Sequence, residues 1–380
     1  MKSKLPNVGT TIFTVMSALA NEHGAINLSQ GFPNFDPPQL LRDLVMKYMN
    51  LGMNQYAPMP GLPALRKMIA GKIGGLYGLD VDPETEITIT AGGTQALFTA
   101  IAALIGPGDE AILLEPAYDS YGPAVEVQGG KAVPYELSAP DYRVDWPRLE
   151  QLITPRTRMI IVNTPHNPTG KVFSSADLRA LEHLAEKHDL WVLSDEVYEH
   201  LIYDGRTHES VFRYPGLFSR SLAVFSFGKT FHNTGWKMGY CVAPEPLMRE
   251  FRKVHQFNVF SVNTPIQYAL AEFLQNPVEY LQLPDFYQQK RDFFLQAIAG
   301  SGLRPIPCEG TYFQLVDYSP VSALPDFEFC QWLTREIGVA AIPVSSFYGN
   351  KCDEKVVRFC FAKTEELLEK AGEKLRALAE

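Results

Sequence analysis

The sequence predicts an α/β protein with a large domain, built on a mostly parallel sheet covered by helices, and a smaller α+β C-terminal domain. Short apolar runs alternate with helical patterns through the middle of the chain. This alternation is typical of βαβ units with helices on both faces of the sheet. The C-terminal part has a different pattern, and a length of 380 residues favours two domains over one core.

The expected elements of the large domain begin after an N-terminal arm. Residues 1–40 form this arm, which ends at Pro37-Pro38, where helix is disfavoured. Helical patterns cover 39–50 and 62–77, and a short strand at 87–90 is followed by Gly92-Gly93-Thr94, which opens an apolar helix through Leu104. The remaining strands are expected at six apolar runs: Ala111–Leu114, Lys131–Tyr135, Met159–Val162, Leu190–Leu193, Ala223–Phe225 and Gly239–Ala243.

The C-terminal segment predicts a second, smaller domain. A helix from about 279 to 299 leads into strands at 312–315 and 356–361, with another helix at 326–337. We therefore expect an arm of residues 1–40 that joins the small domain, a large domain of residues 41–278 and a small domain of residues 279–380.

Composition excludes several classes of partner. The formal net charge of −9 argues against binding to nucleic acid or to an anionic membrane surface, because both need a basic footprint. No run approaches the roughly 20 apolar residues of a membrane span. The expected partners are therefore small molecules, and a local basic pocket for a phosphate remains compatible with the charge.

The five cysteines are scattered and show neither Cys-x-x-Cys nor His-Glu-x-x-His spacing. We expect no disulfide framework and no metal site. The start of the chain imitates a secretory signal, but Pro6, Asn7 and Gly9 interrupt its apolar stretch. Reduced thiols and the absence of a convincing signal favour a cytoplasmic protein.

Two charged residues follow neighbouring apolar runs and carry the chemistry. Lys229 follows Leu222–Phe227, and Asp195 follows Leu190–Leu193. Because ligands collect at the carboxyl ends of parallel strands, both side chains are expected in one site. A lysine amine can bond to an aldehyde and a carboxylate can keep a ring nitrogen protonated, so this pair can hold the two ends of pyridoxal 5'-phosphate.

Each of these residues has a simpler interpretation by itself. Lys229 could be a solvated lysine, although Phe227 and Phe231 flank it. Asp195 could be a turn residue after a strand. Gly228-Lys229-Thr230 could belong to a nucleotide-binding P-loop, but that pattern needs glycine at position 223, which is alanine. The ordered combination favours the cofactor site.

The ordered motifs resemble those of fold-type I pyridoxal phosphate enzymes, and within them the class I/II aminotransferases. The motifs are Asn54-Gln-Tyr-Ala-Pro58, Glu115-Pro-Ala-Tyr-Asp-Ser-Tyr121, Asn163-Thr-Pro-His-Asn-Pro-Thr-Gly170, Ser194-Asp-Glu-Val-Tyr198, Ser226-Phe-Gly-Lys-Thr230 and Phe260-Ser-Val-Asn-Thr-Pro265. The resemblance extends from Leu28 to Phe359 and is strongest to bacterial methionine aminotransferases and the kynurenine aminotransferase group. It implies an aspartate aminotransferase-like fold with a seven-stranded sheet.

The resemblance also implies a phosphate site. It assigns Gly93, Thr94 and Gln95, at the start of a helix, to the cofactor phosphate, together with Ser226 and Lys237. Many relatives carry arginine at the position of Lys237, and lysine lacks the bidentate fork of arginine. Tyr56 is assigned to the phosphate of the neighbouring subunit, which implies a homodimer with shared sites.

The ring and the substrate have their own implied contacts. By resemblance Tyr118 lies over the pyridine ring, and Asn167 and Tyr198 hydrogen-bond its phenolic oxygen. Arg358 lies in an apolar strand, where an unpaired charge is costly, and is expected either in a structural ion pair or as the clamp on the substrate α-carboxylate. The resemblance favours the clamp, with Gly31 and Asn167 at the same substrate.

These residues predict transamination between an amino acid and a 2-oxo acid. Methionine is the favoured donor, with aromatic amino acids, glutamine and kynurenine also expected, because Ile12, Phe13, Phe32 and Phe260 suggest an apolar mouth. The alternative is a β-lyase acting on cysteine S-conjugates or cystathionine-type thioethers, which needs the same lysine, aspartate and arginine. A cofactor-binding regulator is a third interpretation, which would need a DNA-binding module that we do not find ahead of the arm.

Overall fold

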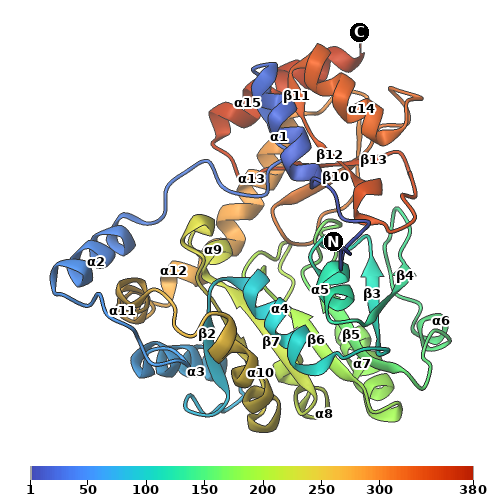
Figure 1. Cartoon of the computed structure of the whole chain (residues 1–380). Coiled ribbons are helices and arrows are strands. Elements are labelled where there is room, and N and C mark those ends of the chain that lie inside the picture. Colours follow the sequence, from blue (N-terminus) through green and yellow to red (C-terminus); the bar gives the residue numbers. More distant parts are fainter. Residues whose placement is uncertain (1, 380) are drawn as a thin grey trace.

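The computed structural model describes residues 2–379 and contains a seven-stranded sheet at its centre (Figure 1). The strand order is β2-β8-β7-β6-β5-β3-β4. Their bounds are Ile87–Thr90 for β2, Glu110–Glu115 for β3, Lys131–Glu136 for β4, Thr157–Asn163 for β5, Trp191–Asp195 for β6, Ser221–Ser226 for β7 and Gly239–Val242 for β8. All pairs are parallel except those that involve β8, which runs against both of its neighbours.

The antiparallel direction of β8 agrees with the lack of a full helix in its connection to β7. Between these strands lie only two short helical segments, α9 (Phe227–Thr230) and η2 (Thr234–Trp236). A parallel neighbour is usually reached through a crossover with a full helix. Because β8 runs antiparallel to β7, it begins at the edge of the sheet where β7 ends. Lys237, just before β8, therefore lies at the cavity.

Helices cover both faces of the large sheet. Alternate strand residues such as Leu113 and Ile161 pack on one face against α4 (Gly93–Leu104), α5 (Tyr121–Val127) and α10 (Glu245–Asn258). Their neighbours Ile112 and Ile160 belong to the core of the other face, which α3 (Pro63–Tyr77), α7 (Ser175–Lys187) and α8 (Pro215–Phe218) cover. This near-continuous burial is the expected pattern for parallel strands enclosed on two sides.

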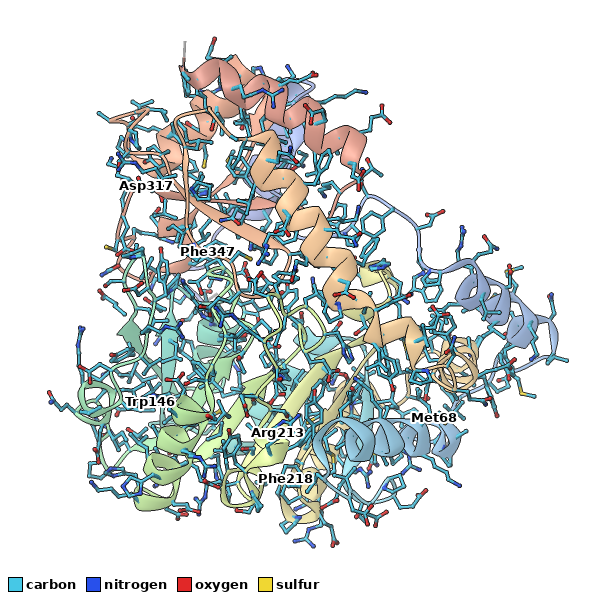
Figure 2. All side chains as sticks on the ribbon, turned by 180° about the vertical axis from the view of Figure 1, so that it is seen from behind. Met68, Trp146, Arg213, Phe218, Asp317 and Phe347 are labelled. Atoms are coloured by element: carbon cyan, nitrogen blue, oxygen red, sulfur yellow. The ribbon has the colours of Figure 1, made fainter. Side chains whose placement is uncertain are left out.

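A second sheet is antiparallel and has the order β12-β13-β10-β9. Its strands are Arg304–Pro305 (β9), Phe313–Asp317 (β10), Ile342–Pro343 (β12) and Val356–Cys360 (β13). The helices in this part of the chain are α13 (Leu283–Ala297), α14 (Asp326–Trp332) and α15 (Glu365–Arg376), with short turns η4 (Val344–Phe347) and η5 (Ala377–Ala379). Figure 2 shows this part from behind, with Asp317 and Phe347 above Trp146 and Arg213 of the large-sheet region.

The N-terminal segment joins the C-terminal part of the chain. Helix α1 (Ile12–Glu22) lies beside the C-terminal elements in Figure 1, and β1 (Ile26–Asn27) pairs in parallel with β11 (Val339–Ala340). This pairing places residues just after β1 next to β13, since Cys360 donates its backbone N–H to the Leu28 carbonyl. The expected arm contact with the C-terminal segment is therefore present, while the domain boundaries at 40/41 and 278/279 stay a prediction.

The fold class predicted from sequence is confirmed, with local differences. The expected helix at 279–299 is divided at Gln282 into α12 (Val278–Leu281) and α13. The expected helix at 326–337 is α14 followed by a π-helical turn, η3 (Leu333–Ile337), which ends at Gly338 with a φ of 77°. The other elements are α2 (Gln39–Asn50), α6 (Trp146–Glu150), α11 (Thr264–Phe273) and η1 (Val211–Arg213).

Residues 2–379 contain neither a membrane-spanning helix nor a cluster of metal ligands. No helix among them is both long and apolar enough to cross a membrane. The same residues contain no group of three or more His, Cys, Asp or Glu side chains able to hold a metal ion.

Candidate active site

A cavity of about 220 Å³ lies at the carboxyl ends of the central strands. All predicted site residues except Gln95 and Tyr56 line it: Gly31, Gly93, Thr94, Tyr118, Asn167, Asp195, Tyr198, Ser226, Lys229, Lys237 and Arg358. They come from the arm, from the start of α4, from the ends of β6 and β7, from β13, and from the segments that follow β3 and β5 or precede β8. The cavity therefore lies between the large sheet and the C-terminal sheet, and both contribute to it.

The start of α4 forms a cradle for an anion. Gly92 precedes the helix with a φ of 80°, a conformation that glycine adopts without strain, and Gly93 is its first residue. A side chain at Gly93 would approach Val197 within 3.1 Å, so glycine leaves the amide end of the helix open. The Lys237 amine lies near Gly92, and Ser226 adds a hydroxyl to the same cavity. Backbone N–H groups at a helix start with a lysine beside them suit a phosphate.

Lys229 projects into the cavity from the turn after β7. Its amine donates to the Tyr312 hydroxyl at 2.8 Å and to the Gly31 carbonyl at 3.3 Å. Burial lowers the pKa of this amine to about 8, and the nearby Arg358 and Lys237 charges act in the same direction. A neutral lysine amine is a nucleophile and a base, and the lowered pKa increases the share of neutral Lys229 amine near neutral pH.

Asp195 is the last residue of β6 and is buried. Its Oδ2 accepts a hydrogen bond of 2.6 Å from the Tyr121 hydroxyl, and its Oδ1 accepts one of 3.3 Å from the Val197 amide. Burial raises the pKa of Asp195 to about 6, while these two hydrogen bonds oppose the rise. A cation placed against this carboxylate would stabilise its ionised form.

Arg358 lies on β13 and is 1% exposed. Its Nη1 donates to Asn167 Oδ1 at 2.8 Å and its Nη2 donates to the Ser29 carbonyl at 3.2 Å, while its Nε has no partner among the described residues. The Phe313 ring lies 3.8 Å from its guanidinium carbon. Among residues 2–379, no carboxylate forms an ion pair with Arg358, which contradicts the structural ion-pair interpretation. A buried, unpaired guanidinium that lines a cavity is a binding group for an external anion.

Asn167 is fixed in place by its neighbour Asn163. The Asn163 side chain accepts from the Asn167 amide at 2.7 Å and donates to the Asp195 carbonyl at 2.8 Å. Tyr198 lies on the opposite side, with its ring edge against Tyr312 at 5.2 Å between centroids. Tyr118 lies near the cradle, where its hydroxyl is 3.4 Å from that of Thr94.

Two predicted residues lie outside the cavity. The Gln95 side chain accepts from the Ala91 amide at 2.9 Å and donates to Thr99 at 2.6 Å, so it supports the turn before α4. Tyr56 is 82% exposed and contacts Phe260 at the surface. The predicted roles of Gln95 and Tyr56 at the cofactor phosphate remain predictions. The Gln95 backbone amide stays at the start of α4, and Tyr56 does not line the cavity of its own chain.

Sequence reasoning missed four contributors to the site. Tyr121, Asn163, Tyr312 and Phe313 contact Asp195, Asn167, Lys229 and Arg358 respectively. Tyr121 and Asn163 stand inside motifs that the sequence analysis had singled out, which was the available signal. Phe313 is the first residue of β10 and Tyr312 precedes it, and nothing in their local pattern indicates a place beside Arg358 and Lys229.

The seven-stranded sheet, the small antiparallel sheet and a lysine, aspartate and arginine in one cavity define an enzyme with the aspartate aminotransferase-like fold. The chain belongs to the family of class I and II aminotransferases, whose model matches residues 23–375. It is 54% identical over 378 residues to the methionine aminotransferase of Escherichia coli K12, covering 99% of this chain and 98% of that protein. It is 37% identical to the human kynurenine–oxoglutarate transaminase 1, covering 94% and 93%.

Solved structures agree with the sequence comparison. The crystal structure of YbdL from Escherichia coli, described as having a methionine aminotransferase function, superimposes with a TM-score of 0.97 at 54% identity and 99% coverage of both chains. An aspartate aminotransferase from Thermus thermophilus superimposes with a TM-score of 0.91 at 32% identity, covering 100% of this chain and 99% of that one.

Proposed function

We propose that this chain is a pyridoxal 5'-phosphate-dependent aminotransferase that exchanges the amino group of methionine, or of an aromatic L-amino acid, with a 2-oxo acid. The observation that carries the proposal is that Lys229, Asp195 and Arg358 line one cavity. The similarity to methionine and kynurenine aminotransferases favours the stated substrates. Glutamine and kynurenine are further donors that the same cavity would accept.

The cavity fits pyridoxal 5'-phosphate at each end of the molecule. The glycine turn before α4, with Ser226 and Lys237, would hold its phosphate. Asp195 would face the ring nitrogen, and its raised pKa indicates a carboxylate that gains from a cationic partner. Tyr118 would lie over the ring, while Asn167 and Tyr198 would bond its phenolic oxygen. When bound, the cofactor supplies a ring that accepts the electrons left on the substrate α-carbon.

The protein supplies binding, orientation and proton transfer. Arg358, fixed by Asn167 and Ser29, would bind the substrate α-carboxylate with its remaining N–H groups, next to the Gly31 backbone. Held in this way, the substrate α-carbon would lie in the same cavity as the Lys229 amine. The Lys229 amine, neutral above pH 8 or so, would then take the proton from that carbon.

The lining of the cavity favours donors with apolar side chains. Among the described residues, the cationic side chains at the cavity are Lys229, Lys237 and Arg358, and each already has a role. A second carboxylate on aspartate or glutamate would be desolvated there without a partner. Phe13 and Leu97 instead offer apolar contact, as expected for methionine and aromatic side chains. Of the expected mouth residues, Phe32 and Phe260 are 45% and 43% exposed and do not line the cavity.

We further propose a cytoplasmic homodimer with shared sites. Exposed apolar side chains gather on α2, on the loop after it and at the end of α10: Leu40, Met46, Met49, Leu51, Met53, Tyr56, Phe257 and Phe260. Such a patch suits an interface with a second copy. Tyr56 would then reach the cofactor phosphate of the partner, which accounts for its 82% exposure in one chain.

A panel of amino donors tests this function. The cofactor-loaded protein is mixed with methionine, phenylalanine, glutamine or aspartate, and conversion of the bound pyridoxal form to the pyridoxamine form is followed by absorbance. We expect methionine and phenylalanine to convert it rapidly and aspartate to be a poor donor. Release of pyruvate and a thiol from a cysteine S-conjugate, without conversion by any amino acid, would instead indicate the β-lyase alternative.

A further inference from the structure

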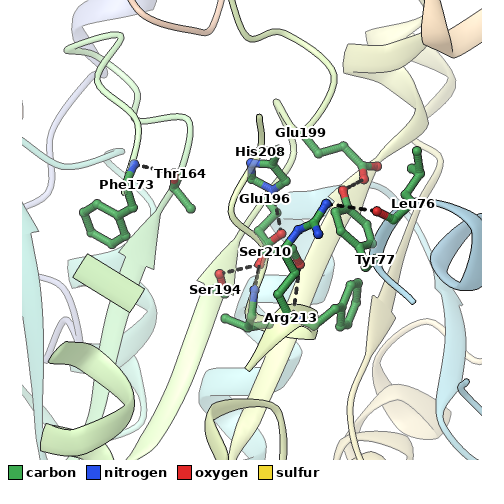
Figure 3. A network of polar contacts seen from close by, with 12 residues as sticks. Leu76, Tyr77, Thr164, Phe173, Ser194, Glu196, Glu199, His208, Ser210 and Arg213 are labelled. Atoms are coloured by element: carbon green, nitrogen blue, oxygen red, sulfur yellow. Dashed lines mark hydrogen bonds and ion pairs between the residues drawn. The ribbon is translucent and has the colours of Figure 1, made fainter. Parts of the chain in front are cut away.

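Two glutamates follow Asp195 in the chain but turn away from the cavity. Glu196 and Glu199 are 0% and 6% exposed, and neither lines the site. Figure 3 shows both residues inside a network of polar contacts. Glu196 accepts from Ser194 at 2.9 Å and is paired with His208 at 2.8 Å. The proposed mechanism uses neither residue, which leaves their buried charges to be explained.

Glu199 makes a second set of buried polar contacts, with α3 and β8. It forms a buried ion pair with Lys72 of α3. It also accepts a hydrogen bond of 2.8 Å from the Tyr77 hydroxyl (Figure 3). The Tyr240 hydroxyl lies 3.0 Å from the Lys72 amine and 3.4 Å from Glu199. Burial would raise the pKa of the Glu199 carboxyl, but Lys72 and His200 hold it well below its usual range. The carboxylate is therefore ionised and its position is fixed from several directions.

The ion pair reaches the cavity through the turn that carries Asp195 and Tyr198. The Glu199 amide donates to the Glu196 carbonyl at 3.0 Å, which closes this turn directly behind Tyr198. Asp195 is also connected to β7, because the amide after it, that of Glu196, donates to the Val224 carbonyl at 2.9 Å. Movement of Glu199 would thus displace the Tyr198 ring and the strand end that carries the Asp195 carboxylate.

The same pair reaches the lysine side of the cavity through Tyr240. This tyrosine of β8 stacks on Phe225 with 4.9 Å between ring centroids and an interplanar angle of 13°. Phe225 immediately precedes Ser226, and Tyr240 follows Lys237 by three residues. The Lys72 amine lies 5.8 Å from the centroid of the Phe225 ring. The Lys72–Glu199 ion pair therefore contacts residues on both sides of the cavity: the turn that carries Tyr198, and the aromatic side chains of β7 and β8.

We propose that Lys72 and Glu199 are positioning residues for the aminotransferase reaction, and this proposal rests on the function proposed above. The pair holds the turn with Asp195 and Tyr198 at a fixed place relative to β7, which ends at Ser226 just before the turn with Lys229, and relative to β8, which begins just after Lys237. Apolar residues would fill the same volume, and replacing buried ion pairs by them often preserves stability. Unlike apolar packing, the hydrogen bonds and the ion pair of Lys72 and Glu199 fix the orientation of the groups they join. Catalytic groups depend on such orientation.

The test compares three variants of the cofactor-loaded protein. The double variant Lys72→Met/Glu199→Gln removes both charges, so that no uncompensated charge remains buried. Tyr240→Phe removes one hydroxyl from the pair and is the milder change. Glu110→Gln is the matched control, because Glu110 is also buried and ion-paired, with Arg156, but lies at the start of β3, at the opposite end of the strands from the cavity.

Three readouts are collected for each variant: the thermal midpoint, the pH midpoint of the cofactor absorbance and the split between kcat and KM for methionine. We expect kcat to fall about tenfold in the double variant with little change in KM, because orientation is lost while the carboxylate clamp is kept. The pH midpoint of the cofactor should shift by about half a unit or more, since Asp195 and Tyr198 set it. Tyr240→Phe should show smaller changes in the same directions.

The control separates positioning from general stability. Glu110→Gln should lower the thermal midpoint while leaving the pH midpoint and kcat unchanged. If the Lys72 and Glu199 changes affect only the thermal midpoint, as in the control, the positioning role is overturned. If the double variant does not fold, Tyr240→Phe carries the same comparison. Failure of the wild-type protein to transaminate any donor would contradict the proposed function, whereas the pH midpoint would still test the positioning of Asp195 and Tyr198.

Discussion

The Tyr121 hydroxyl lies 2.6 Å from Oδ2 of Asp195, in the interior of the protein and behind the cavity. It is the shortest of the contacts that fix this carboxylate, and it opposes the rise in pKa that burial causes. The ionisation of Asp195 therefore depends on a residue that starts α5, 74 positions earlier in the chain.

Tyr121→Phe should raise the pKa of Asp195 further, because the bond that favours its ionised form is lost. One such hydrogen bond contributes about 1 kcal/mol, so kcat/KM at neutral pH should fall about fivefold. The acid limb of the pH–rate profile should move to higher pH. Tyr135→Phe is the matched control, since the Tyr135 hydroxyl is bonded to the Asp145 backbone away from the cavity. An unchanged acid limb in Tyr121→Phe would remove Tyr121 from the control of Asp195.

The Lys229 amine should control how fast the cofactor-free protein captures pyridoxal 5'-phosphate. Burial lowers its pKa to about 8, and only the neutral amine bonds to an aldehyde. Below pH 8 the capture rate should fall about tenfold per pH unit, and above it the rate should level off. Stopped-flow absorbance between pH 6 and 10 or so measures the profile. A rate that keeps rising to pH 10 or beyond would show an unperturbed lysine.

Arg358→Lys should weaken substrate binding while the cofactor remains bound. Lysine keeps the charge but cannot hold Asn167, Ser29 and a carboxylate at once. The loss of charged hydrogen bonds predicts a rise in KM for methionine of about ten- to a hundredfold. The absorbance spectrum of the bound cofactor should stay as in the wild type. A KM within twofold or so of the wild-type value would contradict the role of Arg358 as the carboxylate clamp.

The exposed position of Tyr56 predicts complementation between two inactive chains. In a shared-site dimer, Lys229→Ala chains still lend Tyr56 to a partner, and Tyr56→Ala chains still carry Lys229. Equal mixing after dissociation should restore up to about a quarter of wild-type activity, because half of the dimers are hybrids with one intact site. Sedimentation measures the dimer itself. A fully active monomer, or no recovery in verified hybrids, would contradict the shared site.

Local sequence patterns were sufficient to predict that Asp195 and Lys229 share one site. Asp195 and Lys229 follow apolar runs, and parallel strands bring their carboxyl ends to one edge, so their meeting in one cavity could be predicted. The direction of β8 could not, because it depends on the length and packing of the β7–β8 connection. The contact between Lys229, just after β7, and Tyr312, just before β10, spans 83 positions, and no local periodicity encodes such a relationship.

The surroundings of Arg358 are another feature that local sequence could not predict. Its place in an apolar run indicated a buried charge, but not whether a carboxylate of the protein would neutralise it. Only the structure shows that an asparagine, a backbone carbonyl and an aromatic ring surround it. This distinction decides between an ion pair and a substrate clamp.

The most direct test of the proposed reaction is a single-turnover measurement with methionine on the wild-type protein and on Lys229→Ala, each loaded with pyridoxal 5'-phosphate. The wild-type absorbance should convert fully to that of the pyridoxamine form, with release of the matching 2-oxo acid. Lys229→Ala should bind cofactor and methionine but convert slower by orders of magnitude, because no amine remains to move the α-carbon proton. Conversion by Lys229→Ala at the wild-type rate would contradict the account.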